Sequence, residues 1–326
     1  MKPIRELKKT RKGHNNYVVN SSVSAGNKVK VLLFCPTYKL ASGELAIHNE
    51  TLKSIEGLSI PDNVELEVEI STNNPNPITG NTKQDHENTL HQYRYARQRV
   101  INGDYKYLFI IEHDMIIPEG ALVKMLATDA DVVYGLYQFR HSKPILNACR
   151  AVNSRWPDMT LSLFPEIVEK AKAQGWIEVS GAGFGCTLIR RNVLETFDMR
   201  RSELGGHPSP DMPFAADCMR NGFKQVCRFD VICGHIKPNG DILIPFKRGE
   251  AMSESIKIYV MRSFNANIGG KSVPYKEGDT AEMPSEYVDD YVRCGYITYA
   301  EEPAVKIANK PKVKATKTVK KVEEAE

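Results

Sequence analysis

One stretch of the sequence places two carboxylates at the end of an apolar run. The five residues Tyr107–Ile111 (YLFII) lead directly into Glu112, His113 and Asp114. In an open α/β sheet, ligands bind beyond the carboxyl ends of the strands, so a buried strand here would aim both carboxylates into a crevice. Carboxylate oxygens are the ligands that Mg²⁺ and Mn²⁺ prefer, and either ion can hold a diphosphate. The alternative is that these polar residues only mark the solvated end of a strand and bind no ligand.

The segments that would position this motif alternate between strand-like and helix-like patterns. Apolar or alternating runs predict strands at 29–35, 64–70, 107–111, 131–135, 176–179, 186–190 and 225–232. Periodicity and stop signals predict helices at 43–55, 84–101, 119–127, 165–174 and 212–221. This alternation predicts an α/β domain with a mostly parallel sheet.

The Glu112-His113-Asp114 motif resembles the Asp-x-Asp motif of glycosyltransferases of the GT-A fold, in the broad family-2-like group. Further segments are similar to that family in the expected order: Cys35-Pro36-Thr37-Tyr38, Tyr95-Ala96-Arg97, 130–137, 179–190, Asp211–Phe214 with Gly222-Phe223, and Gly234-His235. The resemblance covers about residues 29–240. It implies a GT-A-like, Rossmann-type mostly parallel sheet flanked by helices, and transfer of a sugar from a nucleotide-sugar donor to an acceptor hydroxyl.

Three positions depart from the family pattern. Glu112 stands where the family has Asp, and Pro210 replaces the acid that usually precedes the catalytic Asp. The Asp that often contacts the nucleotide base after the second strand is absent from residues 71–74 (STNN). The sequence therefore does not identify the nucleotide of the donor.

The resemblance implies a divalent cation, Mn²⁺ or Mg²⁺, which would neutralise the diphosphate leaving group as a Lewis acid. We expect Asp114 to be a direct ligand, His235 a second ligand, and Glu112 a supporting ligand or a ribose contact. A histidine without a ligand is the alternative for His235. Asp211 is the expected general base for the acceptor hydroxyl, which would invert the anomeric configuration. A helix N-cap is the alternative for Asp211.

The donor is expected to contact the end of the first strand. Pro36, Thr37 and Tyr38 would lie against the nucleotide, with His113 beside them. Arg97 would pair with the diphosphate as a forked donor, and its alternative is a solvated helix face.

Three residues are expected on the acceptor side. The glycine run 181–185 opens a strand rather than a helix, so it is not a dinucleotide fingerprint. Gly181 and Gly183 would instead give a substrate close access to the backbone. Trp176 would stack on a sugar ring, or fill a core or interface position.

Charge is divided unevenly along the 326 residues, whose net charge is +4. Residues 1–30 hold eight basic residues and one acid, residues 303–326 hold seven Lys and three Glu, and the body between them holds 29 basic and 36 acidic residues. An acidic body with basic ends is not typical of a uniformly basic nucleic-acid binder.

No apolar run is long enough to predict a membrane span or a secretory signal. Seven scattered cysteines without a Cys-x-x-Cys pair indicate reduced thiols and a cytoplasmic protein, in the host cytoplasm if it is viral.

Four zones are predicted: a flexible basic arm at 1–28, the GT-A-like domain at 29–250, a small α+β module at 256–302 and a Lys-rich tail at 303–326. The module resembles short modules often appended to bacteriophage proteins. Its alternative is a plain extension that packs on the main domain.

A phage context favours a hydroxymethylated DNA base, or a protein or glycan hydroxyl, as the acceptor, and the basic ends would steer the chain to DNA phosphates. The oligomeric state stays open.

Two other functions remain possible on the sequence. A nucleotidyltransferase of related fold would carry a glycine-rich triphosphate loop after the first strand, which residues 36–39 (PTYK) lack. A non-catalytic sugar-binding or nucleotide-binding protein is kept open by the replacements at Glu112 and Pro210.

Overall fold

The computed structural model describes residues 8–9, 16–18, 28–78, 82–140, 145–151, 156–157, 159–201, 209–246, 255–268, 271–284, 287–288, 291–292 and 295–300. Within this part of the chain, no helix is both long and apolar enough to cross a membrane.

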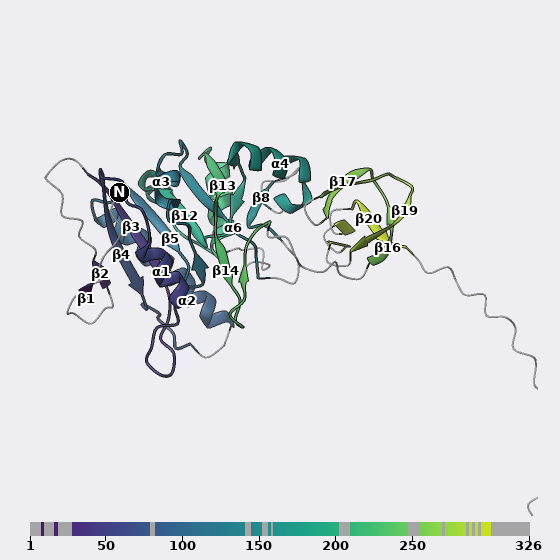
Figure 1. Ribbon diagram of the computed structural model, residues 1–326. Helices are drawn as coiled ribbons and strands as arrows, with labels where there is room; N and C mark the ends of the chain where they lie inside the picture. The colour runs from purple at the N-terminus through teal and green to yellow at the C-terminus, as the bar shows by residue number, and fades with distance from the viewer. Residues whose placement is uncertain are drawn as a thin grey trace, which may run out of the picture.

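A nine-stranded sheet forms the centre of the molecule (Figure 1). Its strands, in spatial order, are β1 (Lys8–Lys9), β2 (Asn16–Val18), β4 (Val64–Ser71), β3 (Val29–Pro36), β5 (Tyr107–Ile111), β12 (Cys186–Arg190), β7 (Val132–Leu136), β13 (Gln225–Ile232) and β10 (Trp176–Glu178). Strands β4, β3, β5, β7 and β13 run in one direction, while β12 lies antiparallel between β5 and β7. The carboxyl ends of five strands therefore meet at one edge.

Helices cover both faces of this sheet. One face packs against α1 (Asn49–Glu56) and α3 (Ala121–Leu126). The other packs against α2 (Thr82–Asn102), α4 (Pro165–Gln174), α5 (Arg191–Thr196) and α6 (Asp211–Arg220). Strands β5 and β7 consist of apolar residues, tyrosine and glycine because both faces of the sheet are covered there. The predicted α/β fold with a mostly parallel sheet flanked by helices is confirmed.

Most predicted elements of the main domain occur within a few residues of their expected bounds. The helix expected from residue 43 begins instead at Asn49. Before it, the chain makes a turn in which Gly43 adopts a φ of 85°, a conformation that glycine tolerates, and Leu40 donates its N–H to the Glu44 carbonyl. Helix α5 was not predicted, since it follows β12 without a connecting loop.

Two small sheets extend beyond the carboxyl edge of the main sheet. One contains β15 (Ile242–Leu243), β14 (Gly234–Ile236) and β6 (Met115–Ile116), and the other contains β11 (Gly181–Ala182), β8 (Ala148–Arg150) and β9 (Met159–Thr160). The first joins the segment after β5 to the segment after β13.

Both ends of the chain contribute strands. Within residues 1–28, β2 pairs with β4 and extends the sheet. The C-terminal module contains β16 (Ser255–Val260), β17 (Phe264–Ile268), β18 (Lys271–Tyr275), β19 (Thr280–Pro284) and β20 (Ile297–Tyr299), visible in yellow-green in Figure 1. Its core includes Leu163 of the main domain, so the module packs on that domain. Residues 287–288 and 291–292 of the module are helical, and the tail 303–326 lies outside the described residues.

Candidate functional site

Strand pairing brings Asp114 and His235 together, although 121 positions separate them in the sequence. Strand β14 pairs with β6 so that His235 lies opposite Met115, and the Ile236 N–H donates to the Asp114 carbonyl at 2.8 Å. His235 Nε2 then lies 3.7 Å from Asp114 Oδ2. Asp114 is 1% exposed and His235 is 5% exposed, so both side chains are buried at the carboxyl end of β5.

The ring of His235 is oriented by the backbone. Its Nδ1 lies 2.8 Å from the carbonyl oxygen of Gln138, which can only accept, so Nδ1 carries a hydrogen. Nε2 therefore faces Asp114. Among the described residues, neither His235 Nε2 nor Asp114 Oδ1 has a hydrogen-bond partner, although both atoms are buried. An imidazole nitrogen and a carboxylate oxygen are both common metal ligands, and a backbone carbonyl behind the imidazole is a usual support for such a ligand.

Asp114 stays ionised in this environment. Burial by itself would raise its pKa, but the neighbouring His235 and the charges of His113 and Arg140 lower it to about 2. Arg140 makes a direct ion pair with it, since its Nη2 lies 2.9 Å from Asp114 Oδ2.

Glu112 behaves differently from its neighbour. Burial raises its pKa from 4.5 to about 7, and the charges of Asp114 and Asp211 add to this, while the hydroxyl of Tyr93 opposes it by donating to Oε1 at 2.7 Å. Glu112 therefore carries a proton for much of the time near neutral pH. Across the described ranges, no three His, Cys, Asp or Glu side chains are grouped to hold a metal ion, so Glu112 is not gathered with Asp114 and His235 as a third ligand.

Asp211 lies in the same polar cluster. It is the first residue of α6, its Oδ1 accepts from the Met212 N–H at 2.8 Å, and its charge raises the pKa of both Glu112 and Tyr137. Pro210 holds the N-cap position, so Asp211 is not the N-cap itself. The structure thus brings the predicted base close to the predicted metal motif.

The glycine run has a packing role that differs from the expectation. A Cβ on Gly183 would lie 2.1 Å from the Tyr137 hydroxyl, and one on Gly181 would lie 2.4 Å from the Ala215 Cβ. Both glycines are buried. They make room for Tyr137 and Ala215, and neither is exposed as the expected acceptor surface would require. Tyr137 itself packs edge-on against His235 and was not predicted as a site residue.

The end of β3 forms the other side of the site. Pro36 and Thr37 are buried, Tyr38 is partly buried, and the Tyr38 ring packs edge-on against His113 at 5.9 Å. The structure therefore places these predicted donor residues beside the carboxylate motif.

Two side-chain amides that were not predicted as site residues hold Thr37. Gln92 Nε2 and Asn74 Nδ2 both donate to the Thr37 carbonyl, at 2.8 and 3.1 Å. The hydroxyl oxygen of Thr37 is buried without a hydrogen-bond partner among the described residues. Gln92 carried no signal, because a polar residue in a long helix is normally on its solvated face.

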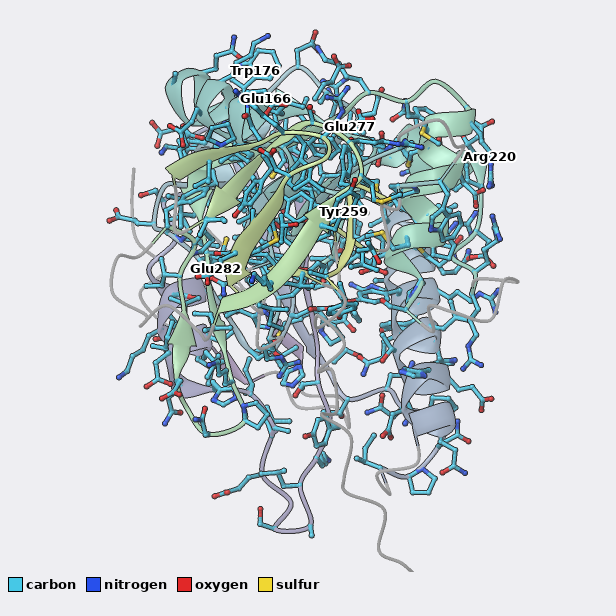
Figure 2. All side chains as sticks on the ribbon, turned by 90° about the vertical axis from the view of Figure 1, so that its right-hand side faces the viewer. Glu166, Trp176, Arg220, Tyr259, Glu277 and Glu282 are labelled. Carbon is cyan, nitrogen blue, oxygen red and sulfur yellow. The ribbon has the colours of Figure 1, made fainter. Side chains whose placement is uncertain are left out.

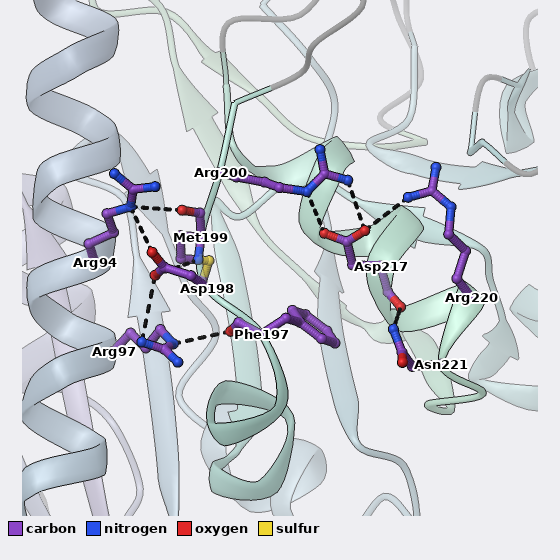
Figure 3. A network of polar contacts seen from close by, with 9 residues as sticks. All are labelled: Arg94, Arg97, Phe197, Asp198, Met199, Arg200, Asp217, Arg220 and Asn221. Carbon is purple, nitrogen blue, oxygen red and sulfur yellow. Dashed lines mark hydrogen bonds and ion pairs between the residues drawn. The ribbon is translucent and has the colours of Figure 1, made fainter.

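Arg97 is not in the site. Its Nε donates to the carbonyls of Leu194 and Phe197, at 2.7 and 3.1 Å, and its Nη1 lies 3.6 Å from Asp198 (Figure 3). The guanidinium joins α2 to the end of α5, so neither the predicted diphosphate contact nor the solvated alternative is correct.

Trp176 also lies apart from the cluster. It belongs to β10, the edge strand, which β12, β7 and β13 separate from β5. The side chain is 40% exposed and lies at the margin of the molecule in Figure 2. Its predicted place beside Gly181 and Gly183 on an acceptor face is not supported, because those glycines are buried.

Comparisons with known proteins leave the family open. No family model and no curated protein matches the sequence. Among solved structures, the crystal structure of A197 from STIV matches with a TM-score of 0.42 and 15% sequence identity, over 69% of this chain and 99% of that chain. A likeness at this level assigns neither family nor activity.

Proposed function

We propose that the protein is a metal-dependent glycosyltransferase that transfers a sugar from a nucleotide-sugar donor to an acceptor hydroxyl. The observation that carries this proposal is the buried Asp114–His235 pair, whose Oδ1 and Nε2 atoms have no hydrogen-bond partner among the described residues. The resemblance of the sequence motifs to GT-A glycosyltransferases gives the reaction class.

Asp114 and His235 would hold Mn²⁺ or Mg²⁺. Such an ion, when bound, supplies Lewis-acid neutralisation of the diphosphate leaving group. Asp114 is ionised and therefore ready to bind a cation, and the Gln138 carbonyl fixes the imidazole with Nε2 toward Asp114. The residues present fit a hard divalent cation with mixed oxygen and nitrogen ligands.

The remaining carboxylates have separate roles. Asp211 would accept the proton of the acceptor hydroxyl, and direct attack on the donor would then invert the anomeric configuration. Glu112, with its raised pKa, would donate a hydrogen bond to the ribose or sugar of the donor. Thr37, Tyr38 and His113 would line the nucleotide.

One observation favours a second candidate, a non-catalytic nucleotide-binding or sugar-binding protein. Arg140 already neutralises Asp114, and a protein that used this carboxylate only for structure would show the same ion pair. The two candidates differ in whether Mn²⁺ is bound and the donor is cleaved.

The test begins with a thermal-shift panel of nucleotide sugars with and without Mn²⁺, because a ligand that binds the native state raises its melting temperature. Hydrolysis of the stabilising donor is then measured. We expect Asp211→Asn to keep the thermal shift and to lose hydrolysis by about 100-fold or more, since a general base contributes that much. The exposed Asp129→Asn is the control and should match the wild type.

A panel in which no nucleotide sugar stabilises the protein would contradict the proposal. Stabilisation without cleavage by the wild type would favour the binding protein instead.

A further inference from the structure

Arg140 connects the buried carboxylate of Asp114 to solvent. The Arg140 side chain is 41% exposed, whereas that of Asp114 is 2% exposed, and the contact is made through Nη2 at 2.9 Å. A guanidinium carries five N–H donors. Donors beyond the one that contacts Asp114 are therefore available on the exposed part of the side chain for an anion that enters the site.

A divalent cation and Arg140 would compete for the same carboxylate. Asp114 Oδ2 faces both Arg140 Nη2 and His235 Nε2, at 2.9 and 3.7 Å. A cation held by Asp114 and His235 would thus lie within a few ångströms of the guanidinium, and like charges at that distance repel. The repulsion falls if the guanidinium moves outward onto a negatively charged ligand.

We infer that Arg140 pairs with Asp114 in the free protein and releases it when the donor binds. Asp114 is then available to the divalent cation, and the Arg140 guanidinium binds the diphosphate. The inference rests on the proposed function and names the arginine that acts there. Arginine suits this second position because its planar fork matches phosphate oxygens. The Nε of Arg97 donates to the backbone carbonyls of Leu194 and Phe197 at the end of α5, so this side chain is already held away from that position.

A matched arginine exists outside the site. Arg220 also contacts a carboxylate at 2.9 Å and is also 41% exposed, but its partner Asp217 is held in addition by Arg200 (Figure 3). In Figure 2, Arg220 lies at the margin of the molecule. Removing its charge leaves the carboxylate paired and should change no ligand binding.

The test measures Mn²⁺ binding to the full chain by the electron paramagnetic resonance signal of free Mn²⁺. Arg140→Gln should bind Mn²⁺ alone about tenfold more tightly than the wild type, because the competing charge is gone. With saturating Mn²⁺, it should bind the best of UDP, GDP, ADP and CDP about tenfold more weakly. Arg220→Gln should change neither value.

Arg140→Lys keeps the charge and loses the fork, so it should hold Mn²⁺ like the wild type and bind the diphosphate more weakly. If Arg140→Gln does not fold, Arg140→Lys still tests the diphosphate contact. Unchanged or weaker Mn²⁺ binding in Arg140→Gln, or full diphosphate affinity in Arg140→Lys, would overturn the inference while leaving the proposed function intact. A wild type that binds neither Mn²⁺ nor any of the four diphosphates would overturn both.

Discussion

Asp114 and Asp217 are both paired with arginine, yet their surroundings differ. Arg200 donates to both oxygens of Asp217 at 2.8 Å, and Arg220 adds a third contact at 2.9 Å (Figure 3). Asp114 is more deeply buried, but its Oδ1 has no hydrogen-bond partner among the described residues. A carboxylate that only ties elements together has both oxygens satisfied, because an unsatisfied buried acceptor is costly. The incomplete pairing of Asp114 supports its proposed role as a metal ligand.

The largest stability difference between the candidate site and the Asp217 network is expected at Glu112, the second carboxylate of the site. Its pKa is about 7 in the folded protein and near 4.5 when unfolded, so the folded state binds the proton more tightly. Its contribution to stability is therefore fully present below about pH 4.5 and is lost as the pH rises through 7. We expect the free energy of unfolding of the wild type to fall by about 2 kcal/mol more than that of Glu112→Gln between pH 5 and pH 7.

Urea denaturation at the two pH values measures this difference. The exposed Glu178→Gln is the control and should follow the wild type. Parallel pH profiles for the wild type and Glu112→Gln would show that Glu112 is an ordinary solvated carboxylate.

The next effect tests the paired carboxylate. Asp217→Asn should lower the free energy of unfolding by about 1–2 kcal/mol, because two arginines lose their charged partner at a site that is only 14% exposed. It should leave Mn²⁺ binding unchanged. Chemical denaturation and Mn²⁺ titration of the same preparation check both statements, and a change in Mn²⁺ affinity would remove the distinction between the two regions.

The smallest effect is expected at the exposed end of the same network. Arg220→Gln should change stability by less than about 0.5 kcal/mol, since Asp217 keeps Arg200 and exposed ion pairs contribute little. A loss comparable to that of Asp217→Asn, measured by the same denaturation, would mean that Arg220 is the main partner.

The fold could be predicted from local patterns. Strand Tyr107–Ile111 and helix Pro165–Gln174 occur at their expected bounds because an apolar run and a Pro-to-Gly segment are local signals. The antiparallel direction of Cys186–Arg190 was not predictable in this way, because strand direction depends on which strands become neighbours.

The site could be predicted only in part. Motif order predicted Glu112, Asp114 and His235 as site residues, but the pairing of β6 with β14 that brings Asp114 beside His235 is a long-range contact without a local signal. The sequence does not show whether Arg97 or Arg140 faces the candidate site, since an arginine at either position could point into a crevice. The packing role of Gly183 depends on Tyr137, a residue 46 positions away in the chain.

The central claim is that Asp114 is a ligand and Asp217 is a structural link. Titration of the full chain with Mn²⁺ in the presence of UDP, GDP, ADP or CDP tests it most directly, with free Mn²⁺ followed by electron paramagnetic resonance. We predict that Asp114→Asn weakens Mn²⁺ binding by about 100-fold or more, since even a supporting residue of a metal ligand changes affinity by 10–100-fold, while Asp217→Asn binds like the wild type. Equal Mn²⁺ affinity in Asp114→Asn and the wild type would contradict the account.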